Sequence, residues 1–529
     1  MPLFTRRLAT AHSAWLLVLA LFIACHVRYV SSVHPLPVHD STAYLGKAAR
    51  ITHLFDTQPL FSALAQSLRA EQRFRPPFHP LRAILLNVNS PGIFSRILLS
   101  NIALILLIAL QLRRLESRIS PAIIPGTAII LWLAFPLTIR QSTSFFSELT
   151  LTPIVLGLYL MLLNPTPPSA RNGIAWGALS GLGCLTKLTF PAFLLPALAW
   201  RLANLPRPVR LPWFTLFLIV IVLIAGPWCG LNCHEILQNF SMNMTVSPDR
   251  PCGSALSIRQ FIWYPLISPQ ILSMAGLLLC VTGTAAAWRR RSRPVNLLII
   301  TLLSGYIVFS LLSHKEYRHV FALTPFAALL AAAGFSSFNV RSLRRVTHLT
   351  LIVVACLNIT AMYRARFDIG VTPIEQINQS RRFDRILSCL GQEGERKRVA
   401  FGSIHMGFCG EAFSVFCEFE TGVRRFDTMY YVGYSERWIN VMTMADYYIC
   451  RSDQQTLDPD SPVFAILEKT RQAITGNRSL APRFTLRCSL PADTPGETWM
   501  IEIYERVVPA DTAEREEWTR ALGDRPKSL

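Results

Sequence analysis

Hydrophobic residues in this chain gather in long runs that short polar stretches separate. A helix needs about 20 apolar residues to cross a bilayer of roughly 30 Å, and eleven runs approach that length. They lie near residues 11–30, 94–112, 120–138, 148–164, 172–186, 188–202, 211–229, 262–284, 295–313, 319–337 and 346–363. Backbone groups in lipid must pair within their own segment, so these runs are expected to be helices. The pattern predicts a polytopic α-helical membrane protein with about eleven spans.

A long polar segment, residues 31–93, follows the first run. Within it, residues 42–56 and 59–70 carry apolar side chains at helical spacing. This spacing is typical of amphipathic helices that lie in the membrane interface. Ordinary loop helices packed on the bundle explain it equally well.

The composition becomes that of a soluble domain after about residue 365. Strand patterns at residues 398–402, 446–451, 484–488 and 499–504 alternate with helical patterns near 374–390, 434–443 and 463–473. Such alternation predicts an α/β domain. We therefore expect a transmembrane domain over residues 1–364, which includes the loop 31–93, and a C-terminal α/β domain over residues 365–529.

The net charge of +20 is a signal of topology. Basic clusters lie at alternate junctions between runs: Arg6-Arg7, Arg113-Arg114 with Arg118, Arg207 with Arg210, Arg289 to Arg293, and Arg341 with Arg344-Arg345. Short cytoplasmic loops collect Lys and Arg in this way. The pattern predicts a cytoplasmic N-terminus, an extracytoplasmic C-terminal domain and no nucleic-acid partner. An excess of Arg over Lys and the lack of an endoplasmic-reticulum retrieval tail favour a bacterial inner (plasma) membrane.

Cysteines on the predicted outer side suggest disulfides, because that compartment is oxidising. Cys233 with Cys252 is the first pair expected, followed by Cys450 with Cys488. Free buried thiols remain an alternative, since unpaired cysteine packs like a small apolar residue.

Ionisable residues accumulate at the predicted outer ends of the spans. They are His39-Asp40 with Tyr44 and Lys47, Arg75 before the second run, Arg140 and Glu148 around a turn, Lys187, and His314-Lys315-Glu316-Tyr317-Arg318. Three of the six lysines fall here, where the positive-inside rule disfavours them. Lys and Arg hold phosphate, so an anion site explains the set. Taken singly, Asp40 and Glu148 also suit helix caps, and Lys187 suits a side chain that reaches water along its span.

The order of these motifs resembles the GT-C fold glycosyltransferases, and more narrowly bacterial relatives of the protein O-mannosyltransferases and the lipid A aminoarabinose transferase. The motifs are His39-Asp40 with Tyr44, Arg75-Pro76-Pro77-Phe78-His79-Pro80, Ser147-Glu148-Leu149, Leu185-Thr186-Lys187-Leu188-Thr189 and His314-Lys315-Glu316-Tyr317-Arg318. The protein mannosyltransferases usually carry Asp-Glu in the first loop. Here Ser41 follows Asp40, which argues against a protein hydroxyl acceptor of their kind.

The resemblance implies transfer of a hexose or pentose, with inversion, from a polyprenyl-phosphate donor to a lipid, glycan or protein acceptor. Asp40 is then the general base, and Lys187, Lys315, Arg318 and Arg75 bind the donor phosphate. His39, Tyr44, Glu148, His314 and Glu316 are expected to support the site. Glu148 is also a candidate ligand for a divalent metal ion. The interfacial helices and the surfaces of the spans are expected to hold the polyprenyl chain, and membrane lipids are expected as further partners.

Two other classes of protein remain as alternatives. A secondary transporter needs ionisable groups at mid-membrane and broken helices in matched halves. A non-catalytic scaffold of envelope assembly predicts that alanine is tolerated in the charged turns. The charges lie at span ends and the halves do not match, so the transferase is the favoured hypothesis.

Overall fold

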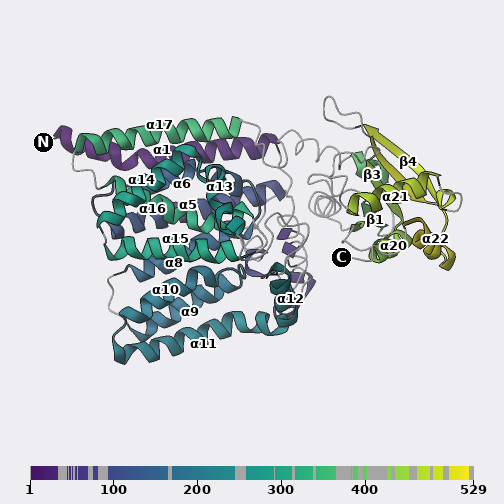
Figure 1. The fold of residues 1–529 in the computed structure, drawn as a ribbon, viewed down its shortest axis with the longest axis horizontal. Coiled ribbons are helices and arrows are strands. Elements are labelled where there is room, and N and C mark those ends of the chain that lie inside the picture. The colour runs from purple at the N-terminus through teal and green to yellow at the C-terminus, as the bar shows by residue number, and fades with distance from the viewer. Residues whose placement is uncertain are drawn as a thin grey trace. The chain divides into compact units, whose positions relative to one another are not determined.

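The computed structural model describes a helical part and an α/β part of the chain (Figure 1). The described residues are 2–33, 44–45, 47–48, 51, 54–55, 57–68, 75–80, 93–164, 169–244, 258–290, 292–312, 316–336, 341–364, 383, 385–390, 397–401, 426–430, 435–451, 462–476, 480–491 and 500–522. They fall into two compact units. The helical unit comprises Met1–Tyr29, Arg50–Ser90 and Ser95–Ala365, and the α/β unit comprises Val30–Ala49, Pro91–Phe94 and Arg366–Leu529.

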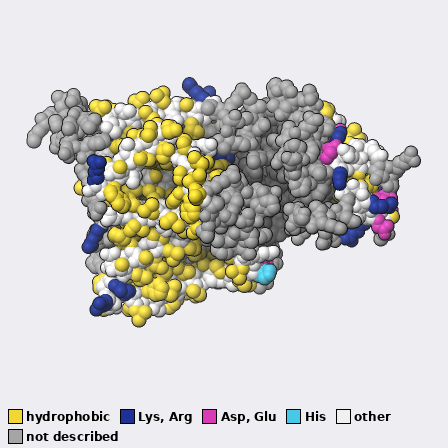
Figure 2. Space-filling model, viewed as in Figure 1, with side chains coloured by type: hydrophobic (Ala, Val, Ile, Leu, Met, Phe, Trp, Pro, Cys, Tyr) yellow, Lys and Arg dark blue, Asp and Glu magenta, His cyan; other side chains and the backbone are white. Residues whose placement is uncertain are grey.

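The helical unit is a bundle of helices. Its elements are α1 (Pro2–Val33), α3 (Leu60–Ser67), α5 (Ile93–Ile119), α6 (Thr127–Ala134), α7 (Pro136–Ser142), α8 (Ser147–Leu162), α9 (Ala170–Cys184), α10 (Pro191–Asn204), α11 (Arg207–Leu231), α12 (Cys233–Met244), α13 (Ile258–Leu272), α14 (Met274–Arg290), α15 (Arg293–Leu311), the 3₁₀ helix η1 (Tyr317–Leu323), α16 (Thr324–Phe335) and α17 (Arg341–Arg364). Apolar side chains cover the face of this unit that Figure 2 shows. Such a surface suits contact with lipid.

Six helical segments of the described residues are long and apolar enough to cross a membrane. They are Ser13–Ser31, Leu98–Ile119, Arg207–Leu231, Arg293–Leu311, Tyr317–Phe335 and Val346–Arg364. The number rises to eight if each of two bent helix pairs counts as one span. The described residues thus contain six to eight candidate spans, where eleven were expected over the whole chain. The difference lies in three of the runs. The run 120–138 forms α6 and α7, of 8 and 7 residues. The runs 172–186 and 188–202 form α9 and α10, of 15 and 14 residues.

Two sharp bends shape the end of the bundle where α7 and α13 lie. The pair Pro136–Ser142 and Ser147–Leu162 bends by 114°, and the pair Phe261–Leu272 and Met274–Arg289 bends by the same angle. The second bend is at Ser273, whose φ of 64° is left-handed and rare for a residue with a Cβ. Irregular backbone at membrane depth must be buried in protein or line a cavity. The backbone at both bends is accordingly packed within the unit, since residues 143–146 and 272–273 are buried or half-buried.

Small residues let α9 and α11 approach closely (Figure 1). Gly173, Gly177 and Gly181 form one stripe on α9 at a spacing of four residues. A Cβ on Gly177 would lie 2.6 Å from the carbonyl oxygen of Phe217, and one on Gly181 would lie 2.8 Å from Cβ of Ile224. Close packing of this kind holds helices together in lipid, where no hydrophobic force acts between them.

The α/β unit contains a five-stranded mixed sheet. Its elements are β1 (Lys397–Phe401), β2 (Phe426–Tyr430), α20 (Ser435–Met444), β3 (Tyr447–Arg451), α21 (Pro462–Gly476), η2 (Ala481–Arg483), β4 (Phe484–Pro491), β5 (Met500–Arg506) and α22 (Thr512–Leu522). The strand order is β2-β1-β3-β5-β4. β1 pairs in parallel with β2 and β3, whereas β5 is antiparallel to β3 and β4. The four expected strands are present, and the sequence pattern did not predict β2 or α22.

Each face of the sheet has its own apolar core, because successive side chains of a strand point to opposite faces. Val399, Phe401 and Ile449 pack with the helical residues Phe383 and Ile386. On the other face, Ala400, Tyr448 and Cys450 pack with α20, α21 and α22, including the buried Trp518.

A disulfide in the described part of the α/β unit joins Cys389 to Cys488, so the expected pair Cys450–Cys488 is wrong. Cys488 packs with the Val399 side of the sheet, whereas Cys450 is buried on the opposite side. Cys450 is a free thiol, and burial raises its pKa well above the ordinary value. The expected pair Cys233–Cys252 is also wrong, because Cys233 is free and exposed. Cys252 itself lies outside the described residues.

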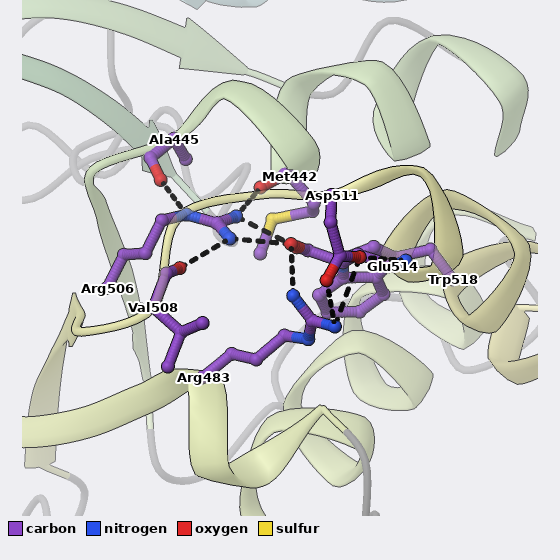
Figure 3. A network of polar contacts seen from close by, with 8 residues as sticks. All are labelled: Met442, Ala445, Arg483, Arg506, Val508, Asp511, Glu514 and Trp518. Atoms are coloured by element: carbon purple, nitrogen blue, oxygen red, sulfur yellow. Dashed lines mark hydrogen bonds and ion pairs between the residues drawn. The ribbon is translucent and has the colours of Figure 1, made fainter.

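A buried carboxylate ties α22 to the sheet (Figure 3). Arg506 donates two hydrogen bonds to Glu514, of 2.7 and 2.9 Å, and Trp518 donates a third of 3.0 Å. Arg506 also donates to the carbonyl of Ala445 at 2.7 Å. Arg483 pairs with Asp511 and, by its hydrogen bond, holds the pKa of that carboxyl below its usual value. The network is fully hydrogen-bonded around Glu514, as a buried charge requires.

Candidate functional site

The turn between α7 and α8, together with the first turn of α8, places polar side chains at one end of the bundle. Hydroxyls of Thr143 and Ser144 donate to the carbonyl of Arg140 at 2.9 and 3.2 Å. The Asn101 amide of α5 donates to the carbonyls of Ser142 and Ser144 at 2.7 and 2.9 Å. These bonds satisfy backbone groups that the helices leave open at their ends. Glu148 follows in the first turn of α8 and is only 1% exposed.

Lys187 reaches this carboxylate from the turn after α9. The turn is tight, because the Lys187 amide donates to the Gly183 carbonyl at 3.1 Å and the Phe190 amide donates to the Lys187 carbonyl at 3.0 Å. The Lys187 ammonium pairs with Oε1 of Glu148. A buried carboxylate needs such a partner, since an isolated charge in this position costs several kcal/mol.

Arg318 completes the cluster from η1. Its Nε lies 3.8 Å from Oε1 of Glu148 and pairs with Oε2 of Glu316. Its guanidinium lies over the ring of Phe146, 4.6 Å from the ring centroid, which stabilises the cation further. The Tyr264 hydroxyl of α13 donates to the Glu316 carbonyl at 3.2 Å. Segments far apart in sequence therefore bring Glu148, Lys187, Glu316 and Arg318 together.

The segment that carries Arg75 is anchored against the same two turns. The Phe78 amide donates to the Leu185 carbonyl at 2.9 Å. The ring nitrogens of His79 lie 2.7 Å from the Thr150 hydroxyl and 3.2 Å from the Phe145 carbonyl. The first turn of α8 and the Lys187 turn thus both contact residues 75–80.

Four of the candidate residues are not described by the structure, and a fifth is described in the α/β unit. His39, Asp40, His314 and Lys315 lie outside the described residues. Tyr44 is described and buried, and it falls in the α/β unit.

Two residues of the site were not among those chosen from sequence. The Arg140 guanidinium lies over the ring of Tyr317, 3.9 Å from the ring centroid. Arg140 had been noted at the outer turn without a role, and Tyr317 only as part of its motif. The sequence features that could have identified them are an Arg in one outer turn and an aromatic residue beside Arg318 in another.

The electrostatics of the cluster favour an anion. Arg140, Lys187 and Arg318 carry three positive charges, and Glu148 with Glu316 carry two negative ones, which leaves one net positive charge. A metal ion fits poorly, because Glu148 already faces two cations. Among the described residues, no group of three or more His, Cys, Asp and Glu side chains could hold a metal.

Comparisons with known proteins show a similarity of sequence over one segment and a similarity of fold. Residues 260–381 match the model of the Alg9-like mannosyltransferase family. The chain has no match among curated protein sequences. The crystal structure of ArnT from Cupriavidus metallidurans in the apo state is similar over 96% of this chain and 99% of that chain, with a TM-score of 0.55 and 13% identity.

A second ArnT structure, bound to undecaprenyl phosphate, covers 94% of this chain and 98% of its own, with a TM-score of 0.56 and 13% identity. At this identity the likeness is one of fold. The match to the mannosyltransferase model includes Glu316 and Arg318, which are part of the cluster around Glu148. The chain therefore has the fold of ArnT, and its residues 260–381 are similar to the Alg9-like mannosyltransferase family.

Proposed function

We propose that this protein is an integral-membrane glycosyltransferase that moves a sugar from a polyprenyl-phosphate donor to a lipid, glycan or protein acceptor. The observation that carries the proposal is the pair of cations, Lys187 and Arg318, held beside the buried Glu148. The fold supports it, since a protein of this fold has been crystallised with undecaprenyl phosphate. A phosphate on a lipid chain lies at the depth of such a basic site between helices.

The reaction is a direct displacement that inverts the anomeric carbon. The acceptor oxygen forms a bond to this carbon, and the bond from the carbon to the phosphate oxygen breaks. The phosphate keeps the electron pair, and Asp40 accepts the proton of the acceptor hydroxyl. A positioned base contributes typically 10²–10⁴-fold to such a step.

Fixed cations stabilise the phosphate because its charge grows as the bond breaks. Lys187 and Arg318 are the described members of this set, and Lys315 and Arg75 are its further proposed members. Glu148 orients Lys187, and Glu316 orients Arg318. His39, Tyr44 and His314 are proposed to support Asp40 and Lys315 from the neighbouring positions. The site faces the extracytoplasmic side of the membrane, opposite to the basic loops.

The substitution Asp40→Asn tests the proposal. Asn caps a helix about as well as Asp, so a structural role predicts full activity, whereas loss of the base predicts a fall of about 10²–10⁴-fold in turnover. The measurement is the consumption of polyprenyl-phosphate sugar by purified protein in lipid vesicles. Ser41→Ala is the matched control, because it changes the neighbouring polar residue and keeps the carboxylate. Wild-type turnover by Asp40→Asn would refute the role of Asp40.

A further inference from the structure

A chain of hydrogen bonds links α1 and α17 to the last residue of α7. The two long helices lie side by side (Figure 1), and the centroid of the Tyr363 ring lies 6.3 Å from that of His26 and 5.8 Å from that of Tyr29. Nδ1 of His26 lies 3.3 Å from the Tyr363 hydroxyl. This hydroxyl lies 3.4 Å from Oγ of Ser142, where α7 ends. The proposed reaction has given this polar path no role.

The donors of the path all point in one direction. The Ser142 hydroxyl donates to the Ile139 carbonyl at 2.6 Å, and a hydroxyl has a single proton to donate. Oγ of Ser142 therefore accepts from the Tyr363 hydroxyl, and the Tyr363 oxygen accepts from an N–H at Nδ1 of His26. The ring proton of His26 is thus on Nδ1, and Nε2 is left as an acceptor. Among the described residues, this Nε2 has no hydrogen-bond partner.

The path ends at the turn on which the site is built. The carbonyls of Ser142 and Ser144 accept from the Asn101 amide of α5, while the Ser142 hydroxyl is held from α17. The end of α7 is therefore fixed from two sides. Arg140 lies two residues before Ser142, and Glu148 lies six residues after it. A shift of this turn would move both charged residues.

Stability alone does not account for His26. The residue lies in the candidate span Ser13–Ser31 and is fully buried. A buried polar atom without a partner costs free energy, and an apolar side chain at this position would avoid that cost. Ionisable residues inside membrane spans are rare and typically serve function. The histidine is therefore better explained by what it holds than by how it packs.

We propose that His26 and Tyr363 are positioning residues, which hold the turn between α7 and α8 in the arrangement that sugar transfer requires. The inference deepens the proposed function and rests on it. The N–H of His26 orients the Tyr363 hydroxyl, and this hydroxyl fixes the end of α7. Both residues act through Arg140 and Glu148, which the turn carries.

Tyr363→Phe tests the path at its centre, because it removes the hydroxyl and keeps the ring. Backbone hydrogen exchange of residues 140–147, measured by mass spectrometry on the full-length protein in detergent, should become about 2- to 10-fold faster, as loss of one hydrogen bond implies. Turnover of polyprenyl-phosphate sugar should fall by about 2- to 30-fold, a range typical of residues that act through others.

Tyr159→Phe is the matched control for this substitution. It also removes a buried tyrosine hydroxyl, which bonds to Thr301 between α8 and α15. Because this contact is separate from the path, the exchange of residues 140–147 should stay as in the wild type.

Substitutions of His26 separate positioning from packing. His26→Leu removes the donor together with the unpaired acceptor, so the midpoint of thermal unfolding should rise or stay within about 2 °C of the wild type. Exchange at the turn and turnover should nevertheless change as in Tyr363→Phe. His26→Asn places an amide N–H where Nδ1 stands and should restore both. The double variant of His26→Leu and Tyr363→Phe should be no worse than either single variant, because both break the same path.

The outcomes distinguish this inference from the proposed function. Faster exchange at the turn and lower turnover in a stably folded His26→Leu protein support the positioning role. If His26→Leu and Tyr363→Phe both exchange as the wild type does at residues 140–147, the positioning role is refuted and the proposed function stands. If the wild-type protein transfers no sugar, the proposed function is refuted, and the exchange measurement still decides whether the path holds the turn. If His26→Leu does not fold, Tyr363→Phe decides alone.

Discussion

Glu148 is the residue on which the charges of the site depend. It is almost fully buried, pairs with Lys187 and lies within 3.8 Å of Nε of Arg318. Removal of one partner from a buried pair typically costs about 3–5 kcal/mol, whereas replacement of both partners by neutral groups is often nearly neutral. The carboxylate therefore stabilises the two cations and holds them in place beside it.

A double-mutant cycle on this pair gives the first prediction. Glu148→Gln should lower the free energy of unfolding, because Lys187 and Arg318 then repel each other without compensation. Adding Lys187→Met should recover part of the loss, with a coupling energy of about 1–3 kcal/mol. Thermal unfolding of the purified single and double variants measures it. Strictly additive losses would show that the two residues do not act as a pair.

The sequence predicted part of this cluster. Glu148, Lys187, Glu316 and Arg318 were chosen because charged residues at outer span ends are unusual, and the structure brings them together. Arg140 was noted at the same turn but given no role, and its contact with the ring of Tyr317 could not be foreseen because a cation–π contact has no fixed spacing in sequence. The pairing of Cys488 with Cys389 could not be foreseen either, since it depends on which face of the sheet each residue occupies.

At the scale of helices, close contact between α9 and α11 positions the Lys187 turn. Lys187 follows α9, and the neighbouring Leu185 packs with Trp228 near the end of α11. A helix pair that moved apart would move Lys187 away from Glu148. The glycine stripe of α9 is thus connected to the site as well as to stability.

Gly177→Ala tests this packing. The new Cβ would lie 2.6 Å from the Phe217 carbonyl oxygen and 2.8 Å from Cβ of Val220, so the helices must separate, at a cost of typically 1–3 kcal/mol for an overpacked site. A lower midpoint of thermal unfolding is expected. Gly230→Ala is the matched control on α11, because a Cβ there meets no atom within 4 Å. Equal stability of the two variants would contradict the close approach.

Hydropathy located the helices better than it located their breaks. The run 262–284 was taken as one span, yet it is interrupted at Ser273 and bends by 114°. Hydropathy averages over a window and does not register one residue with a left-handed backbone. The run 120–138 likewise divides at Phe135, where the backbone is extended before Pro136, as a residue before proline favours.

At the scale of the helical unit, the two ends have different chemistry. The site end contains Asn101 near the start of α5, Glu148 at the start of α8 and Trp228 near the end of α11. Arg114 and Arg118 near the end of α5, and Arg207 at the start of α11, lie at the opposite ends of the same helices. Figure 2 shows Lys and Arg side chains along the margin of the apolar surface. The positive-inside rule predicts that the basic end faces the cytoplasm, which would place the site at the outer face.

Cysteine labelling in sealed right-side-out vesicles tests this orientation. The background keeps the Cys389–Cys488 disulfide and replaces the other cysteines with Ser. Cys233, which is exposed at the start of α12 just after α11 ends, is then restored alone and should react with a membrane-impermeant maleimide in intact vesicles. Arg114→Cys, exposed at the basic end, should react only after the vesicles are opened. The reverse pattern would place the proposed phosphate site on the cytoplasmic side and exclude an extracytoplasmic acceptor.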